Sequence, residues 1–196
     1  MTDPDATQES DATLIERYRR GDTAALETLV EKHRRPLFGF VLGMGLGRSD
    51  ADDVFQETWL RVLKNLEAYR QQNFGGWLMR IAHNLVIDRV RRRKPDASLD
   101  EEQGEGQSLV SALPGAGPSP SDAAQASDVG AAIARAVEAL PPEQKAVFLM
   151  RSYADLSFKE IARIQRVSIN TALARMQYAL AKLRVVLKPH YQLLGR

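Results

Sequence analysis

The sequence predicts an all-α protein of two small helical domains joined by a flexible acidic linker. Apolar residues recur at intervals of three or four along most of the chain, and no stretch alternates apolar with polar residues as a strand would. Residues 95–127 interrupt this pattern, because they are rich in Pro, Gly, Ser and Asp and offer little to bury. Residues 95–134 hold seven of the 25 acidic residues and no Lys or Arg. The rest of the chain therefore has 27 basic and 18 acidic residues, which is an excess of positive charge. Basic folded parts joined by an acidic segment indicate nucleic-acid binding.

The first domain is predicted to span residues 11–94, after a polar, disordered tail at residues 1–10. Its first helix begins after Asp11 and stops at Gly21. The second helix is interrupted at Pro36, because proline lacks a backbone donor and kinks helices.

A third helix is predicted to begin at Ser49, whose hydroxyl is a good N-cap. Its first turn carries the acidic residues Asp50, Asp52 and Asp53. The helix is expected to bury Val54, Phe55, Leu63 and one of Trp59 and Leu60. The crowded carboxylates are favoured as anions at a helix start, so they do not resemble a catalytic pair with separated pKa values. A polar face for a protein partner, or a merely solvated face, fits better.

The fourth helix, Phe74–Lys94, follows a polar loop and combines an apolar side with a basic end. From Leu78 onward it holds six Lys/Arg and one acid, which suits a polyanion surface. The alternative is a solvated helix whose arginines favour the negative end of its own dipole. The apolar side consists of Trp77, Leu78, Ile81, Leu85 and Val90.

The second domain is predicted to span residues 128–187, with a short tail at 188–196. Pro141–Pro142 begins one helix, and Ser157 with Glu160 forms a capping box that opens the next. Ser168 caps a longer basic helix that runs from Ile169 to about Leu187. Two helices joined by a short turn, the second longer and basic, are typical of a helix-turn-helix.

Several functional classes are excluded by what the sequence lacks. It has no cysteine, and its three histidines are not at metal-ligand spacing, so no metal or other cofactor is predicted. GMGLG lacks the lysine of a phosphate-binding loop, and no nucleophile–base motif is present, so the protein is not expected to be an enzyme. No signal peptide and no apolar run of about 18 residues is found, which predicts a cytoplasmic protein without membrane insertion.

Three stretches together resemble the bacterial extracytoplasmic-function (ECF) sigma factors of the sigma-70 superfamily. DADDVFQETWLRV resembles the family's polymerase-binding helix, FGGWLMRIAHNLVIDRVRRR its −10 helix, and LPPEQKAVFLMRSYADLSFKEIA the opening of its C-terminal domain. The resemblance covers nearly all of the chain except the N-terminal tail. It implies a factor without catalysis of its own that binds core RNA polymerase, recognises −10 and −35 promoter elements, melts the promoter and directs initiation. Family members are often paired with an anti-sigma factor, which adds one as a candidate partner.

The resemblance also implies where the sites lie. Contacts to the clamp of the largest polymerase subunit are expected at Asp50, Asp53, Gln56, Glu57 and Arg61, with the β-flap as a second polymerase contact. Contacts to the −10 element, including a pocket for a flipped base at residues 65–74, are expected at Tyr69, Phe74, Trp77, Arg80, Asn84, Arg91 and Arg92. Contacts to the −35 element are expected at Ser168, Asn170, Thr171, Leu173, Ala174, Arg175, Gln177 and Tyr178.

The recognition helix departs from the family pattern. Leu173 stands where the family usually has a basic residue, and it cannot make a bidentate contact to guanine. We therefore expect a −35 element that is read less through arginine–guanine pairs, with Gln177 favouring adenine or Leu173 meeting a thymine methyl group. The usual glycine of the turn is also replaced, by Gln165–Arg166.

Two other functions remain open at this point. One is a stand-alone helix-turn-helix regulator that binds DNA through residues 140–187, with the first domain as a ligand or dimerisation module. The other is a helical adaptor. Neither of these two functions explains why the first domain contains a basic helix.

Overall fold

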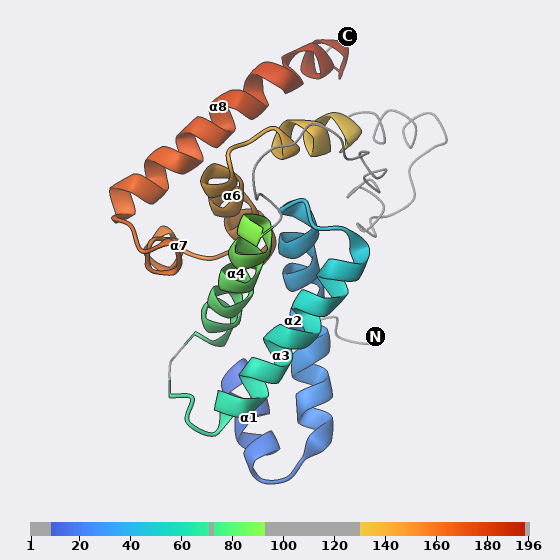
Figure 1. Cartoon of the computed structure of the whole chain (residues 1–196), viewed down its shortest axis with the longest axis vertical. Coiled ribbons are helices and arrows are strands. Elements are labelled where there is room, and N and C mark those ends of the chain that lie inside the picture. The colour runs from blue at the N-terminus through green and yellow to red at the C-terminus, as the bar shows by residue number, and fades with distance from the viewer. Residues whose placement is uncertain (1–8, 71–72, 93–129, 195–196) are drawn as a thin grey trace, which may run out of the picture.

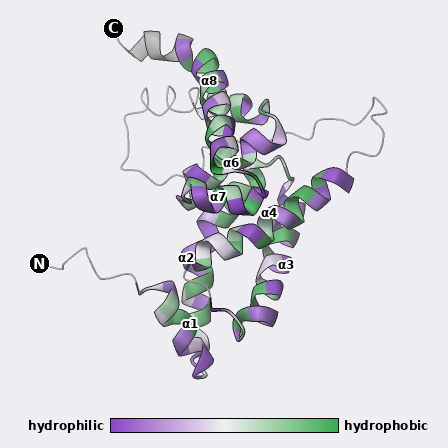
Figure 2. Ribbon diagram, turned by 90° about the vertical axis from the view of Figure 1, so that its left-hand side faces the viewer, coloured by the Kyte–Doolittle hydropathy of each residue, from purple (hydrophilic) through white to green (hydrophobic). Residues whose placement is uncertain are grey.

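The computed structural model describes residues 9–70, 73–92 and 130–194, with the side chains of 189–194 left out, and these residues form helices, turns and loops without a strand. The helices run in the order α1, α2, α3, α4, α6, α7 and α8, with a further helical stretch at 130–138 (Figure 1). Each helix is amphipathic, so apolar and polar positions occur side by side along α3, α4 and α8 (Figure 2). The prediction of an all-α protein is confirmed. The predicted tail and linker fall mainly on residues 1–8 and 93–129, outside the described residues.

The first two helices form an antiparallel pair. α1 spans Asp11–Arg19 and is capped by the side chain of Ser10, which accepts a hydrogen bond from the backbone N–H of Thr13. α2 spans Thr23–Gly43 without a break, so Pro36 does not divide it as the sequence predicted. Buried side chains on both sides of the proline, Leu29, Leu37 and Phe40 among them, hold the helix together against the lost hydrogen bond.

A charged cluster joins α1 to α2. Both carboxylate oxygens of Asp11 are engaged, one by Lys32 Nζ at 2.8 Å and the other by His33 Nε2 at 3.0 Å. Burial acts to raise the pKa of Asp11, but the hydrogen bonds and charges of His33 and Lys32 outweigh it and lower this pKa to about 2. The carboxylate is therefore more acidic in the folded chain than in the unfolded one.

Asp11→Asn is expected to lower the free energy of unfolding at pH 7 by about 2 kcal/mol. Because the folded pKa is depressed, the contribution of Asp11 is complete above about pH 4 and disappears as the pH falls toward 2. Urea unfolding of both proteins between pH 7 and pH 2.5 checks this, and the difference between their free energies of unfolding should shrink steadily below about pH 4. Asp52→Asn, which removes an exposed carboxylate 3.7 Å from Arg48, is the matched control and should change stability by less than about 0.5 kcal/mol. A pH-independent difference between the Asp11 variant and the wild type would contradict the assignment.

α3 spans Arg48–Leu66, and its N-cap lies two residues earlier than predicted. Its N-cap is Gly47, which has no side chain to bond, so Ser49 lies inside the first turn and is not the cap. Trp59 is buried and Leu60 is 52% exposed. Trp59 is therefore the core residue of the two, a choice that the periodicity of the sequence left open. The difference of one position turns a side chain by about 100° around the helix, enough to move it from core to surface.

α4 spans Phe74–Arg92 and packs against α2 and α3. Leu78 and Leu85 of its predicted apolar side are buried. The other members of that side, Trp77, Ile81 and Val90, are partly buried against the same core. The prediction of an amphipathic basic helix at this position is confirmed.

The C-terminal half contains α6 (Pro142–Ala154), α7 (Phe158–Gln165) and α8 (Ile169–Leu194). The predicted capping box is present, with Ser157 and Glu160 satisfying each other's backbone N–H groups at the start of α7. Arg166 ends α7 in the left-handed conformation, at φ 56°, where the related motif usually has glycine. α8 continues to Leu194 through most of the segment that was predicted to be a tail.

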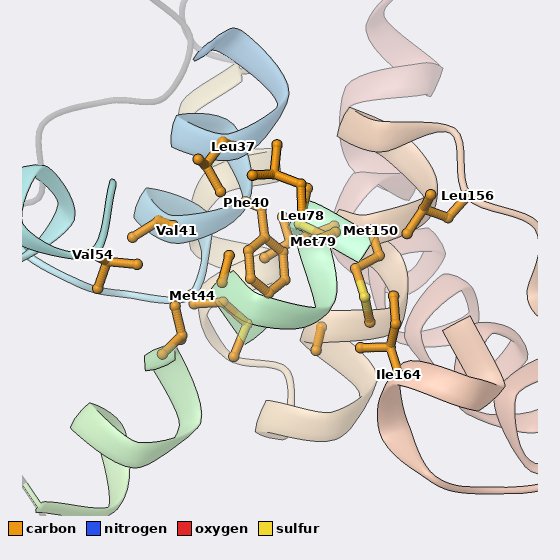
Figure 3. Close-up of a cluster of buried hydrophobic side chains, with 14 of the residues drawn as sticks. Leu37, Phe40, Val41, Met44, Val54, Leu78, Met79, Met150, Leu156 and Ile164 are labelled. Carbon is orange, nitrogen blue, oxygen red and sulfur yellow. The ribbon is translucent and has the colours of Figure 1, made fainter. Parts of the chain in front are cut away.

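The two halves of the chain share one hydrophobic core. α6 packs along α2, and both α6 and α7 contact α4. Figure 3 shows Phe40, Met44 and Leu78 of the first half in one cluster with Met150 and Ile164 of the second. Gly39 and Gly43, one turn apart on α2, make room for the ring of Tyr153 and the side chain of Leu149 on α6.

Candidate nucleic-acid interface

A loop between α3 and α4 is held in shape by an arginine from α1. The guanidinium of Arg19 donates to the backbone carbonyls of Leu66, at 2.8 Å, and of Tyr69, at 2.6 Å. Asn73 closes the other end of the loop, because its side chain accepts a hydrogen bond from the backbone N–H of Gly76 in the first turn of α4. Neither Arg19 nor Asn73 was singled out from the sequence, since a side chain that binds distant backbone atoms leaves no local pattern.

The aromatic side chains of this loop and of α4 form one cluster. Phe74 lies at its centre, 2% exposed, with ring centroids of Trp59, Tyr69, Trp77 and His33 5.2–6.1 Å away. Tyr69 and Trp77 are partly buried, and their ring centroids are 4.7 Å apart. Burial and the nearby charge of Asp11 raise the pKa of Tyr69 to about 12, so its hydroxyl stays neutral at physiological pH. Phe74 is therefore a core residue in this arrangement, whereas Tyr69 and Trp77 border the surface.

An exposed polar stripe runs along α4 away from the core. It begins at Arg80, continues at Asn84 and reaches Arg91 and Arg92 in the last turn. The spacings of four and seven residues place Arg80, Asn84 and Arg91 on one side of the helix, and Arg92 follows about 100° further round. Each of these four residues, which were expected on the DNA-facing side of the helix, is exposed.

The polar face of α3 contains the residues predicted to bind a partner and one exposed apolar residue that was not predicted there. Asp53, Gln56 and Arg61 are exposed, and Asp50 is partly buried. Glu57 accepts a hydrogen bond from Arg61 at 2.8 Å, and this contact is the main cause of the lowered pKa of Glu57. Leu60 stands among these polar groups as a large exposed apolar side chain.

The polar faces of α3 and α4 meet at a shallow groove. It is lined by Glu57, Arg61, Leu85, Asp88, Arg89 and Arg92. Arginines from both helices therefore line the same groove, and the charge of Arg89 on α4 contributes to the lowered pKa of Glu57 on α3. Glu57 and Arg61 of α3 and Arg92 of α4, which were predicted for two separate faces, form one charged surface along this groove.

The helix-turn-helix of α7 and α8 presents most of its predicted residues to solvent. Ser168 bonds the backbone N–H of Thr171 at 3.0 Å and its hydroxyl at 2.8 Å, so both side chains complete the cap of α8. The exposed members are Ser168, Asn170, Thr171, Leu173, Gln177 and Tyr178, and Ala174 and Arg175 are partly buried. This confirms the predicted cap and leaves Gln177 and Tyr178 free to reach outward.

Arg175 is directed inward. Its guanidinium donates to the side-chain carbonyl of Gln165 at 2.7 Å, and the amide of Gln165 donates to the backbone carbonyl of Glu143 at 3.0 Å. Burial lowers the pKa of His83 on α4, against a hydrogen bond with Asn84, and the positive charge of Arg175 lowers it further. Arg175 is thus held by the last residue of α7, and its charge acts on His83 of α4.

Within the described ranges, no group of His, Asp and Glu side chains could hold a metal ion. Among the same residues, no helix has the length and apolar character needed to cross a membrane.

Comparisons with known proteins agree with both halves of the chain. The model of sigma-70 region 2 matches residues 29–95, and that of sigma-70 region 4 matches residues 130–183. The chain is 31% identical over 194 residues to the ECF RNA polymerase sigma factor SigE of Mycolicibacterium smegmatis, covering 96% of this chain and 70% of that protein. It is 29% identical over 177 residues to the ECF RNA polymerase sigma factor SigW of Bacillus subtilis, covering 89% of this chain and 95% of that protein.

Two solved structures share the fold. CnrH, solved in complex with the cytosolic domain of CnrY, superposes with a TM-score of 0.65 at 21% identity, covering 92% of this chain and 99% of that one. The sigma factor RpoE of Bartonella quintana, solved in complex with the anti-sigma factor NepR, gives a TM-score of 0.62 at 19% identity, covering 88% and 98%.

Proposed function

The chain belongs to the ECF family of RNA polymerase sigma factors, and we propose that α3 binds core polymerase, α4 reads the −10 element and α8 reads the −35 element. As a sigma factor, it binds core RNA polymerase and promoter DNA and directs transcription initiation. The observation that best supports our assignment is the continuous surface of α3 and α4, because a factor that opens DNA on the polymerase needs both contacts side by side. A stand-alone regulator is not favoured, since the relatives match both halves.

The −10 element would be recognised by three kinds of contact. Tyr69 and Trp77, whose ring centroids lie 4.7 Å apart, would supply the aromatic contact for an unstacked base, and such stacking is worth roughly 1–3 kcal/mol per base. This is comparable with the few kcal/mol needed to extrude a base. Arg80 and Asn84 would contact base edges, and Arg91 with Arg92 would hold phosphates without regard to sequence. Phe74 is left out of this assignment, because its ring is enclosed by its neighbours.

The polymerase would be bound at two places. The clamp of the largest subunit would contact the α3 face of Asp50, Asp53, Gln56, Glu57 and Arg61, with Leu60 at its centre. The β-flap would contact the C-terminal half, where the exposed apolar residues Leu180, Val185 and Val186 of α8 suit a protein surface. Because polymerase is the site of action, we place the protein in the bacterial cytoplasm, on the nucleoid during initiation, and assign it no catalysis.

An anti-sigma factor is a further proposed partner. RpoE, whose fold this chain shares, was solved with one. An anti-sigma factor would compete with polymerase for the same surfaces, so the binding experiments below should use the isolated chain.

Transcription in vitro from a random promoter library, with purified core polymerase, tests these assignments together. Promoters selected by the wild type should share a −10 and a −35 element, and Arg80→Ala with Asn84→Ala should relax the −10 preference by about 10-fold or more. Arg91→Ala is the control, because loss of a phosphate contact should weaken all promoters about equally. At the −35 element we expect few guanines, since Leu173 replaces a basic residue and Arg175 is turned inward. Recovery of a guanine-rich −35 element, or of no shared element, would overturn the corresponding assignment.

A further inference from the structure

We propose that Gln165 determines specificity at the −35 element, because it holds the guanidinium of Arg175 away from DNA and so reduces the preference of α8 for guanine. This inference rests on the proposed function, since it takes α8 as the helix that reads the −35 element. Gln165 is the last residue of α7 and acts through Arg175. It is therefore a positioning residue and needs no contact with DNA of its own.

Arg175 is rooted on α8 beside residues that face solvent. Thr171 stands four positions before it and Tyr178 three positions after it, and both are exposed, Tyr178 by 64%. Residues three or four positions apart are neighbours on the surface of a helix, so Arg175 lies at the edge of the surface proposed to read DNA. Arginine is the side chain that most often contacts guanine, through the O6 and N7 atoms of the base. The direction of the guanidinium therefore decides whether this contact can form.

The guanidinium is held from within the helix-turn-helix. Arg175 is partly buried, and its Nη1 donates to Oε1 of Gln165 at 2.7 Å. Gln165 is itself fixed, because its Nε2 donates to the backbone carbonyl of Glu143 at 3.0 Å. The amide satisfies both partners in only one orientation, with its nitrogen toward the carbonyl and its oxygen toward the arginine. The acceptor for Arg175 is thus oriented before any DNA is bound.

All three residues of this hydrogen-bond chain belong to the C-terminal half. Glu143 lies in the first turn of α6, Gln165 ends α7, and Arg175 lies in the second turn of α8. These three helices contact one another. The chain of hydrogen bonds therefore does not depend on the contacts with α2 and α4, and it can persist while α8 is bound to a promoter.

The bond to Gln165 is comparable in strength with the DNA contact that it competes against. A bidentate arginine–guanine pair favours guanine over other bases by roughly 5-fold to 150-fold. A hydrogen bond to a charged group shifts an equilibrium by roughly 10-fold to 150-fold. Because these ranges overlap, an arginine that must first leave Gln165 keeps little of its preference for guanine. Removal of the Gln165 acceptor should restore that preference.

Transcription in vitro from promoters randomised only at the −35 element, with the full-length protein and core polymerase, measures the base preference. Gln165→Leu keeps most of the size of the side chain and removes both of its polar atoms. We expect this variant to select guanine at one −35 position at least tenfold more strongly than the wild type. Gln165→Leu with Arg175→Ala should lose this gain, because the released arginine supplies it.

Gln165→Glu is the matched control. It loses the amide hydrogen that is donated to Glu143, but it keeps an acceptor for Arg175 and makes that contact charge-assisted. Its preference for guanine should stay within about twofold of the wild type. A merely structural effect of the lost bond to Glu143 would instead appear in Gln165→Leu and Gln165→Glu alike.

A second measurement tests the hold on Arg175 without DNA. Phenylglyoxal modifies free guanidinium groups, and mass spectrometry of peptides gives the rate at each arginine. Arg175 should be modified at least fivefold faster in Gln165→Leu than in the wild type. Arg163, which is exposed on α7, should be modified at the same rate in both proteins.

The outcomes separate this inference from the proposed function. Equal modification of Arg175 in the two proteins would show that Gln165 does not hold it and would overturn the proposal. Faster modification without a gain of guanine, or a gain that survives Arg175→Ala, would overturn the role in specificity. If the wild type selects no shared −35 element, the proposed function fails and the role in specificity fails with it, while the modification rates still decide whether Arg175 is held.

Discussion

The triple variant Asp53→Ala, Gln56→Ala and Leu60→Ala is expected to bind core RNA polymerase about 100-fold or more weakly than the wild type. The three side chains are exposed on one face of α3, and Leu60 is the apolar residue among them. Truncation costs more than about 1 kcal/mol only at the residues that carry an interface, and three of these together should account for about 3 kcal/mol. The fold should be unaffected, because none of the three is in the core. Titration of fluorescently labelled protein with core polymerase measures the change.

Glu16→Ala with Arg20→Ala is the matched control for this variant. These residues form an exposed ion pair at 3.0 Å on α1, outside the proposed polymerase surface. Affinity within about twofold of the wild type is expected for the control. If the triple variant also bound normally, the polymerase contact would lie elsewhere, and a DNA-binding role independent of polymerase would regain support.

Phe74→Ala is expected to lower the free energy of unfolding by about 3–5 kcal/mol. The ring is 2% exposed and is enclosed by four other rings, so its removal leaves a cavity that the surrounding helices cannot fill. Urea denaturation followed by circular dichroism measures the loss. Phe74→Leu keeps most of the volume and should lose much less, about 1–1.5 kcal/mol.

Trp77→Ala separates the structural role from the proposed reading role. Trp77 is only partly buried, so its loss should destabilise the fold less than Phe74→Ala. It should nevertheless reduce promoter opening strongly, as measured by permanganate reactivity of unpaired thymines in the polymerase–promoter complex. If Phe74→Ala kept nearly full stability and abolished opening, Phe74 would be a base-contacting residue and our assignment to the core would be wrong.

Local signals explain what could be predicted from the sequence. The capping box of Ser157 and Glu160 was predicted because both partners lie within one turn. The prediction of Ser49 as the N-cap was wrong because the N-cap of α3 is Gly47, which makes no side-chain hydrogen bond. A serine near the start of a helix does not reveal that the helix begins earlier without a side-chain cap. The choice between Trp59 and Leu60 stayed open because adjacent positions can each satisfy an approximate periodicity, and only packing decides between them.

The contacts between the halves had no such signal. Asn73 and Glu160 are 87 positions apart, and nothing near either residue indicates the other. A glycine inside a helix does not indicate by itself which residue packs against it. The close packing of Tyr153 on Gly39 and of Leu149 on Gly43 is therefore visible only in the structure. For the site, the exposed stripe of α4 followed from helical spacing. The burial of Phe74 did not, because an aromatic residue at the start of a helix can face either way.

The hydrogen bonds from Arg19 to the loop between α3 and α4 determine which segment has to be transferred when a chimaera of two related proteins is made. The region 2 match begins at residue 29, yet the loop next to α4 takes its shape from an arginine ten residues earlier. A chimaera that received residues 29–95 alone would inherit the aromatic side chains without the arginine that orders their loop. For the −10 recognition that we propose, the smallest portable module therefore includes α1, which lies outside the residues that match sigma-70 region 2.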